Sequence, residues 1–308
     1  MDHVIDVIGK SPVLHGPRDE MAYLMYLDPV DAPLIVENLE MLACSRGYSK
    51  VVAKVPAKET GRFLAAGYQL EAALPCLSHE DDAACYMAKY FCSDRKTELQ
   101  PLLVREVLAA AHQQQPVGVL PAPMDARVYE LPESEYGRVA DFLGRFSSAS
   151  PVDPAPVSAA RRKGVLFFGA SANDELAALA CVTVDANTAS TEITELLCTK
   201  EAEEYWVNHL LQQLERELLA AGTKRLFAMA RAYSFGNNIV FARNGYCFAG
   251  TLTNNSCRHG RMESANAWFK HLQEDPQMAW SSVFKKEELR NRMQDSPFPP
   301  NSNASERI

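Results

Sequence analysis

Short apolar runs with two different spacings divide the first part of the chain into alternating strands and helices. Runs rich in β-branched and aromatic residues predict strands at Met21–Leu27, Lys50–Val55, Tyr68–Leu74 and Ala83–Tyr90. Between them, apolar positions with helical spacing predict helices at Pro33–Ser45 and Ala57–Ala66, which Gly47 and Gly67 then end. The predicted order is strand, helix, strand, helix, strand, strand.

The same order recurs in the C-terminal part of the chain. The expected elements are Glu192–Cys198, Tyr205–Ala221, Lys224–Ala230, Phe235–Asn244, Tyr246–Thr253 and Ala265–Lys270. Two phrases also align, LEMLACSRGYSKVVAKV with LERELLAAGTKRLFAMA and RFLAAGYQLEAAL with VFARNGYCFAGTL. Such repetition indicates that one supersecondary unit is used twice. The segment Ser-Phe-Gly-Asn-Asn, which opens the helix Phe235–Asn244, has no counterpart in the first copy, so we interpret that copy as a scaffold without an active site.

The region between the two copies contains a helix, a linker and the start of a second domain. The pattern predicts helices at Thr97–His112 and Pro132–Phe146, strands at Ala126–Glu130, Gly164–Ala170 and Glu175–Val184, and a proline-rich loop at Ser147–Val157. The strand Glu175–Val184 is nearly continuously apolar, which is typical of a central strand. A helix at Trp280–Met293 and a disordered tail at Asp295–Ile308 complete the prediction. We therefore expect domains at 1–96 and 124–275, a helix and linker at 97–123, and a C-terminal extension at 276–308.

Composition narrows the functional classes. The chain of 308 residues is 47% hydrophobic with a formal net charge of −8, which is typical of a globular protein and disfavours nucleic acid or an anionic membrane as partner. No apolar signal segment or run long enough to span a bilayer is seen, so we expect a cytoplasmic protein. The eight cysteines form no CxxC pairs, so we expect buried free thiols and no metal site.

The motifs of the second copy carry a resemblance to a known family. The order of elements after residue 124 resembles the GNAT superfamily of N-acetyltransferases. The segments ARAYSFGNNIVFARNGYCFAGTLTNNS and NAWFK, with IDVIGKSPVLHG, GYSKVVAKVP and EDDAACYMAKYF, resemble the beta-lysine N-acetyltransferases over about residues 5 to 270. The resemblance implies an α+β fold, a mixed sheet flanked by helices after a smaller half-repeat domain. It also implies acetyl transfer from acetyl-CoA to the side-chain amine of beta-lysine, giving N6-acetyl-beta-lysine, a compatible solute that serves osmoadaptation. A homodimer is left open.

This reaction needs a proton acceptor, because an ammonium group near pKa 10.4 must lose a proton before it attacks a thioester. Glu192 and Glu195 lie on the strand that the resemblance places beside acyl-CoA. They are three positions apart, so a regular strand would turn them to opposite faces, and only one would be in the site. We prefer Glu195 and keep open that both are solvated. Many members of the superfamily use a helical tyrosine as proton donor to the thiolate; Phe241 stands at that position here, and Tyr233 is the substitute, unless it is only a packed aromatic residue.

The resemblance also implies ligand contacts. A zwitterionic amino acid needs hydrogen bonds and a cation for its carboxylate, and the matching motifs supply Arg231, Asn238, Asn254, Asn255 and Asn266. The adjacent Asn254 and Asn255 could instead form a turn. The expected contacts of acetyl-CoA are Leu196, Leu197, Cys198, Glu204, Tyr205, Trp206, Val207, Asn237, Phe241 and Arg243. Arg243 is expected at the CoA phosphates, or else exposed.

The expected pyrophosphate loop departs from the family. The resemblance implies a pattern close to Arg-Gly-x-Gly-Leu, whose backbone amides hold the phosphates at a helix N-terminus. This chain has Lys200-Glu201-Ala202-Glu203-Glu204-Tyr205-Trp206-Val207, with no glycine and three carboxylates. Two readings follow: an N-acetyltransferase with a degenerate loop, or a protein of the same fold that binds a ligand or regulates without catalysis.

Overall fold

The computed structural model describes residues 4–74, 83–118, 127–146, 154–162, 164–172, 175–185, 189–199, 205–258 and 260–272. The chain forms two compact units. Unit 1 comprises Met1–Gln113, Met229–Ile239 and Cys247–Trp268, and unit 2 comprises Gln114–Ala228, Val240–Tyr246 and Phe269–Ile308. Among the described helices, none combines the length and apolarity that crossing a bilayer requires.

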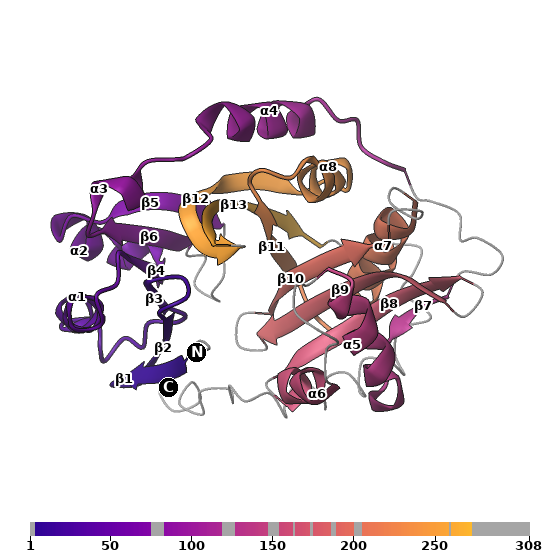
Figure 1. The fold of residues 1–308 in the computed structure, drawn as a ribbon, viewed down its shortest axis with the longest axis horizontal. Helices are drawn as coiled ribbons and strands as arrows, with labels where there is room; N and C mark the ends of the chain where they lie inside the picture. The colour runs from indigo at the N-terminus through magenta and orange to yellow at the C-terminus, as the bar shows by residue number, and fades with distance from the viewer. Residues whose placement is uncertain are drawn as a thin grey trace, which may run out of the picture. The chain divides into compact units, whose positions relative to one another are not determined.

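Unit 1 is built on a mixed sheet whose neighbouring strands run in the order β1-β2-β3-β4-β6-β5-β12-β13 (Figure 1). The strands are β1 (Val4–Ile8), β2 (Ser11–Gly16), β3 (Met21–Leu24), β4 (Lys50–Pro56), β5 (Gln69–Leu74), β6 (Ala84–Tyr90), β12 (Cys247–Arg258) and β13 (Arg261–His271). The helices are α1 (Ile35–Arg46), α2 (Thr60–Ala65) after the short 3-10 turn η1 (Ala57–Glu59), α3 (Ser93–Lys96) and α4 (Pro101–His112).

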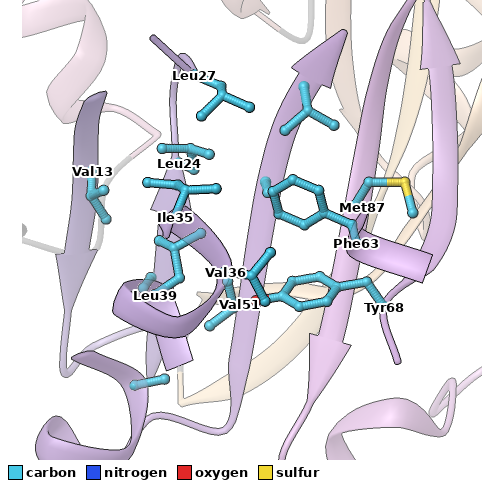
Figure 2. Close-up of a cluster of buried hydrophobic side chains, with 14 of the residues drawn as sticks. Val13, Leu24, Leu27, Ile35, Val36, Leu39, Val51, Phe63, Tyr68 and Met87 are labelled. Atoms are coloured by element: carbon cyan, nitrogen blue, oxygen red, sulfur yellow. The ribbon is translucent and has the colours of Figure 1, made fainter. Parts of the chain in front are cut away.

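The core of unit 1 lies between α1, α2 and the sheet. Figure 2 shows Ile35 and Leu39 of α1 beside Leu24 and Val51 of the strands, with Phe63 of α2 next to Met87 of β6. These side chains are almost completely removed from water. Because burial of one large apolar side chain contributes roughly 1.5–3 kcal/mol, this cluster stabilises the N-terminal copy without help from a ligand.

Unit 2 contains strands that are flanked by helices (Figure 1). Its strands are β7 (Arg127–Glu130), β8 (Val165–Ala172), β9 (Glu175–Asp185), β10 (Ser190–Cys198) and the first part of β11 (Arg225–Arg231), in the order β7-β8-β9-β10-β11. Its helices are η2 (Glu133–Glu135), α5 (Tyr136–Gly144), α6 (Pro154–Arg162), α7 (Tyr205–Ala220) and α8 (Phe235–Arg243), which bridges the two units in sequence. The strand β9 pairs on both sides, as its apolar sequence predicted.

The internal repeat is confirmed by the strand pairing. The first copy is β3-α1-β4-α2-β5-β6 with the neighbour order β3-β4-β6-β5, and the second is β10-α7-β11-α8-β12-β13 with the neighbour order β10-β11-β13-β12. In both copies the first two strands pair in parallel, Met21 opposite Lys50 and Ser190 opposite Arg225.

The repeat extends to one ionic cluster. In the first copy the Lys89 ammonium lies 2.7 Å from Glu40, donates to the carbonyl of Ala66, and sits 5.7 Å from the ring of Tyr68.

In the second copy the Lys270 ammonium lies 2.6 Å from Glu215, donates to the carbonyl of Asn244, and sits 5.5 Å from the ring of Tyr246. A glycine with positive φ precedes each tyrosine, Gly67 at 84° and Gly245 at 80°. These residues hold the helix end against the last strand in both copies, so they belong to the scaffold.

Three parts of the secondary-structure prediction were wrong or incomplete. The hairpin β1–β2 was not predicted, and α6 forms where prolines indicated a loop; Pro154 is its first residue, a position where proline costs no hydrogen bond. The predicted helix Thr97–His112 is shorter than expected, because α4 begins only at Pro101 and residues 97–100 are not helical.

The structure leaves part of the prediction untested. The helix Trp280–Met293 and the tail Asp295–Ile308 lie outside the described residues. The domain boundaries stay a prediction. The compact units do not follow single cuts of the chain, because β12 and most of β13 belong to unit 1.

Candidate active site

A β-bulge on β10 decides where the two candidate carboxylates point. Glu192 lies opposite Thr183 of β9 and Glu195 lies opposite Cys181, with the register shift between Ile193 and Glu195. Residues directly opposite each other share a face, and positions 181 and 183 of a regular strand share a face as well.

Glu192 and Glu195 therefore lie on the same face of the sheet, and the expectation that they face opposite sides was wrong. The bulged residue is Thr194, which is exposed and donates to the carbonyl of Cys181. One extra residue in a strand delays the alternation by one position, so residue 195, and not residue 194, returns to the face of residue 192.

The position of Glu195 is supported by its effect on a neighbour. Burial, with a smaller effect from the Glu195 carboxylate, raises the pKa of the Cys181 thiol to about 12. Cys181 packs in the cluster that includes Tyr136 and Val139 of α5. Glu192 and Glu195 thus lie on the α5 face, and both are half-buried.

The remaining predicted residues of β10 divide between the two faces. Leu196 is 3% exposed and lies opposite Ala180, whereas Leu197 packs against the cluster that contains Cys181. Cys198 is half-buried at the end of the strand. The parallel pairing of β10 with β11 covers Ser190–Ile193, so these three residues follow it.

The next predicted contacts form the first turn of α7. Tyr205 and Trp206 touch edge to face at 5.9 Å, and Tyr205 also stacks on His209 at 6.1 Å. Val207 is buried. Glu204 and the rest of the predicted loop lie outside the described residues. The first turn of a 16-residue helix is a place where backbone N–H groups can bind an anion.

Tyr233 belongs to a hydrogen-bonded cluster in unit 1. Its hydroxyl donates to Oε1 of Glu98, and Oε2 of Glu98 accepts from the hydroxyl of Ser264 on β13. The backbone N–H of Gln100 also donates to Oε1, at 2.8 Å. Glu98 was missed in the sequence because residues 97–112 were interpreted as one helix; the signal was Pro101, which marks the true start of α4.

Arg231 ends β11 in a two-pronged ion pair. Its Nε and Nη2 donate to the two oxygens of Glu263 at 2.7 and 2.8 Å. The Arg231 side chain is 50% exposed and that of Glu263 is 12% exposed. The pair presents a cation and an anion side by side, which suits a ligand that carries both charges.

Asn238 and Asn266 form the buried connection between α8 and β13. Oδ1 of Asn238 accepts from Nδ2 of Asn266 and from Nε1 of Trp268, both at 2.9 Å, and its Nδ2 donates to the carbonyls of Arg231 and Ser234. Oδ1 of Asn266 accepts from the hydroxyl of Thr251. Both asparagines are 0% exposed, so here they fix backbone segments; their predicted contact with substrate stays a prediction.

Asn254 and Asn255 fall within β12. Asn254 has a left-handed backbone with φ of 45° and donates through Nδ2 to the carbonyls of Arg95 and Thr97. It thereby fixes the segment that leads to Glu98. Within the described residues, the buried Oδ1 atoms of Asn254 and Asn255 accept no hydrogen bond.

Three predicted cofactor contacts lie on α8. Phe241 is 1% exposed and packs against Tyr246 with ring centroids 5.0 Å apart, while Asn237 and Arg243 are half-buried. Burial and the Glu215 carboxylate raise the pKa of Tyr246 well above its usual value. Phe241 is therefore a core residue, and the structure offers no proton donor at its position.

One buried ionic network was not foreseen. The Lys50 side chain is 0% exposed, and its ammonium lies 2.8 Å from Oε2 of Glu71 and 2.7 Å from the carbonyl of Thr253. Oε1 of Glu71 accepts from the hydroxyl of Tyr90 and from the N–H of Thr253. The network joins β4, β5 and β6 to β12 just before Asn254. In the sequence, Lys50 looked only like the polar start of a strand.

A curated protein that spans nearly the same length is similar to this chain. Beta-lysine N(6)-acetyltransferase of Methanococcus maripaludis is 24% identical over 277 residues, which are 88% of this chain and 99% of that protein. This chain is a homologue of N-acetyltransferases. N-acetyltransferase YodP of Bacillus subtilis is 28% identical over 121 residues, 39% of this chain and 44% of YodP. The predicted resemblance is confirmed. No family model matches the chain.

Solved structures of acetyltransferases are similar to about half of this chain. The ribosomal-protein-S18-alanine N-acetyltransferase of Escherichia coli covers 50% of this chain with 99% of its own, at 16% identity and a TM-score of 0.43. A phosphinothricin acetyltransferase of Sinorhizobium meliloti in complex with acetyl-CoA covers 52% with 98% of its own, at 13% identity and a TM-score of 0.43. These similarities concern the fold alone. The predicted fold class, a mixed sheet with helices preceded by a half-repeat, is confirmed by the strand order of the chain itself.

Proposed function

We propose that this acetyltransferase homologue transfers an acetyl group from acetyl-CoA to the terminal side-chain amine of beta-lysine or a similar diamino acid. The observation that carries the proposal is the bulge on β10, which brings Glu192 and Glu195 to one face of the strand predicted to lie beside acyl-CoA. The relative that spans nearly the whole chain bears the name of this reaction. A product without the second positive charge would serve as a neutral solute.

The side chains divide the chemistry between them. Acetyl-CoA, when bound, supplies the activated thioester. Glu195 is proposed to take the proton of the reacting ammonium, and Glu192 to add negative charge on the same face. Arg231 offers its half-exposed guanidinium to the substrate carboxylate. We do not propose Tyr233 as the proton donor to the departing thiolate, because its hydroxyl donates to Glu98.

The residues at the expected pyrophosphate site suit a phosphate group only in part. The first turn of α7 provides helical N–H groups, as phosphates require. Against this, the sequence places Glu201, Glu203 and Glu204 directly before the helix. Two unit charges about 4 Å apart repel by about 4 kcal/mol at an effective dielectric constant near 20, which corresponds to several hundredfold in affinity at most.

Removing these charges is expected to tighten acetyl-CoA binding. The triple variant Glu201→Gln/Glu203→Gln/Glu204→Gln should lower the Kd at least about tenfold, since each substitution removes a negative charge that precedes in sequence the helix terminus proposed for the phosphates. Isothermal titration with acetyl-CoA measures the Kd, and Asp141→Asn, at an exposed position of α5, is the matched control. An unchanged Kd would place the phosphates elsewhere.

The carboxylate-rich loop favours one other function, a non-catalytic module that binds a ligand or regulates a partner. A thiol-release assay with acetyl-CoA across lysine, beta-lysine and polyamines separates the two. Turnover with a diamino acid supports the enzyme. Absence of both binding heat and turnover at millimolar acetyl-CoA would contradict the enzyme and support the non-catalytic module.

A further inference from the structure

The cluster around Tyr233 shows which way its hydroxyl proton points. That proton goes to Oε1 of Glu98, while Ser264 and the N–H of Gln100 occupy further positions on the same carboxylate. A hydroxyl has one proton to donate and lone pairs to accept with. The hydroxyl oxygen of Tyr233 can therefore act toward a ligand as a hydrogen-bond acceptor, and the carboxylate of Glu98 places a negative charge next to it.

The groups around Tyr233 keep its hydroxyl protonated. Burial, the hydrogen bond to Glu98 and the charge of Glu98 raise the pKa of Tyr233 well above its usual value, and Glu263 adds to the rise. The phenol thus keeps its proton throughout the pH range of enzyme assays. Because the charge of Glu263 is already paired with Arg231, it is the Glu98 carboxylate beside the neutral hydroxyl that makes a local environment favouring a cation.

Other contacts hold Glu98 where it is. Asn254 donates to the carbonyl of Thr97, directly before Glu98, and its own N–H donates to the hydroxyl of Ser264. Asn254 is 1% exposed, and its Oδ1 accepts no hydrogen bond from the described residues. The same few residues thus bring a second buried acceptor close to the Glu98 segment.

We infer that Tyr233, held by Glu98, accepts a hydrogen bond from the ammonium group of the substrate that is not acetylated, and so selects diamino acids over monoamino acids. Tyr233 is the residue that touches the substrate, and Glu98 is a positioning residue. Arg231, which ends β11 two positions before Tyr233, would hold the carboxylate of the same ligand. This inference rests on the proposed function.

The test compares two substrates that differ by the second amine alone. Beta-lysine carries it and 6-aminohexanoate does not, while both carry the reacting amine and the carboxylate. Tyr233→Phe and Glu98→Gln should each lower kcat/KM for beta-lysine roughly 10- to 100-fold, mainly through KM, since a hydrogen bond to a charged group is lost. The kcat/KM for 6-aminohexanoate should stay within about twofold.

The controls separate recognition from folding and from the proposed function. Glu106→Gln, on the exposed side of α4, should change neither substrate. The double variant Glu98→Gln/Tyr233→Phe should lose no more than Tyr233→Phe alone, because the two residues act as one unit. A loss of stability would lower both substrates equally, so the ratio between them reports recognition.

Calorimetric titration of the two ligands into the same variants repeats the comparison without turnover. If the wild type turns over neither substrate but binds beta-lysine more tightly than 6-aminohexanoate in a Tyr233-dependent way, the reaction is wrong and this inference holds. Equal losses for both ligands, or no preference in the wild type, would overturn the inference.

Discussion

Replacing Glu195 by glutamine is expected to lower kcat by about 10²- to 10³-fold, the usual contribution of a general base. The amide keeps the shape of the side chain but cannot take a proton. The rate of the variant should then keep rising with pH toward the ordinary pKa of the amine, about 10.4, because only molecules already deprotonated in solution react. Steady-state thiol release between pH 7 and pH 10 measures both effects.

Glu192→Gln is the matched comparison, because the bulge places Glu192 on the same face. We expect a smaller loss, about tenfold, from the missing charge. Asp141→Asn, exposed on α5, should have no effect. A larger loss in Glu192→Gln than in Glu195→Gln would reverse the two roles, and no loss in either would remove β10 from the proton transfer.

Breaking the buried pair of Lys50 and Glu71 is expected to destabilise the protein by about 3–5 kcal/mol, because one charge then stays buried without its partner. Glu71 has a side chain only 2% exposed and also holds Tyr90 and the N–H of Thr253. Chemical denaturation of Glu71→Leu measures the loss. The double variant Lys50→Met/Glu71→Leu removes both charges and should recover most of the stability.

The pH dependence of the unfolding free energy gives a second test of the buried pair of Lys50 and Glu71. Burial lowers the pKa of Lys50 from 10.5 to about 8. Between these values the unfolded chain binds a proton that the folded protein does not, so the unfolding free energy should rise with pH, by up to about 1.4 kcal/mol per pH unit.

Tyr90, whose pKa burial and Glu71 raise, acts in the opposite direction above pH 10, so the window to measure is pH 8 to 10. The rise should be absent from Lys50→Met/Glu71→Leu. Its presence there, or its absence from the wild type, would contradict a Lys50 whose pKa is lowered by burial.

Periodicity and self-similarity were enough to predict most of this fold. The repeat appears in the sequence as glycine-tyrosine pairs at 67–68 and 245–246, and in the structure as the same strand order and the same lysine-glutamate-tyrosine cluster. These features are local or periodic, so a sequence displays them directly.

The features that decide the site were harder to foresee. A bulge depends on how two strands pair, so nothing around Thr194 alone indicated that Glu192 and Glu195 share a face. Glu98 and Tyr233, which form a hydrogen bond, are 135 positions apart in the sequence. Lys50 and Glu71 come from the N-terminal copy and bond to the backbone of Thr253 in β12, directly before Asn254. Long-range contacts of this kind leave no periodic pattern.

Acetyl transfer to the terminal amine of a diamino acid can be measured in a single reaction. Purified protein is incubated with acetyl-CoA and beta-lysine, free thiol is followed, and the product is identified by mass and by NMR. We expect one acetyl group per molecule, on the terminal amine, with thiol released in equal amount. No thiol release at millimolar acetyl-CoA, or acetylation of the amine next to the carboxylate end, would contradict it.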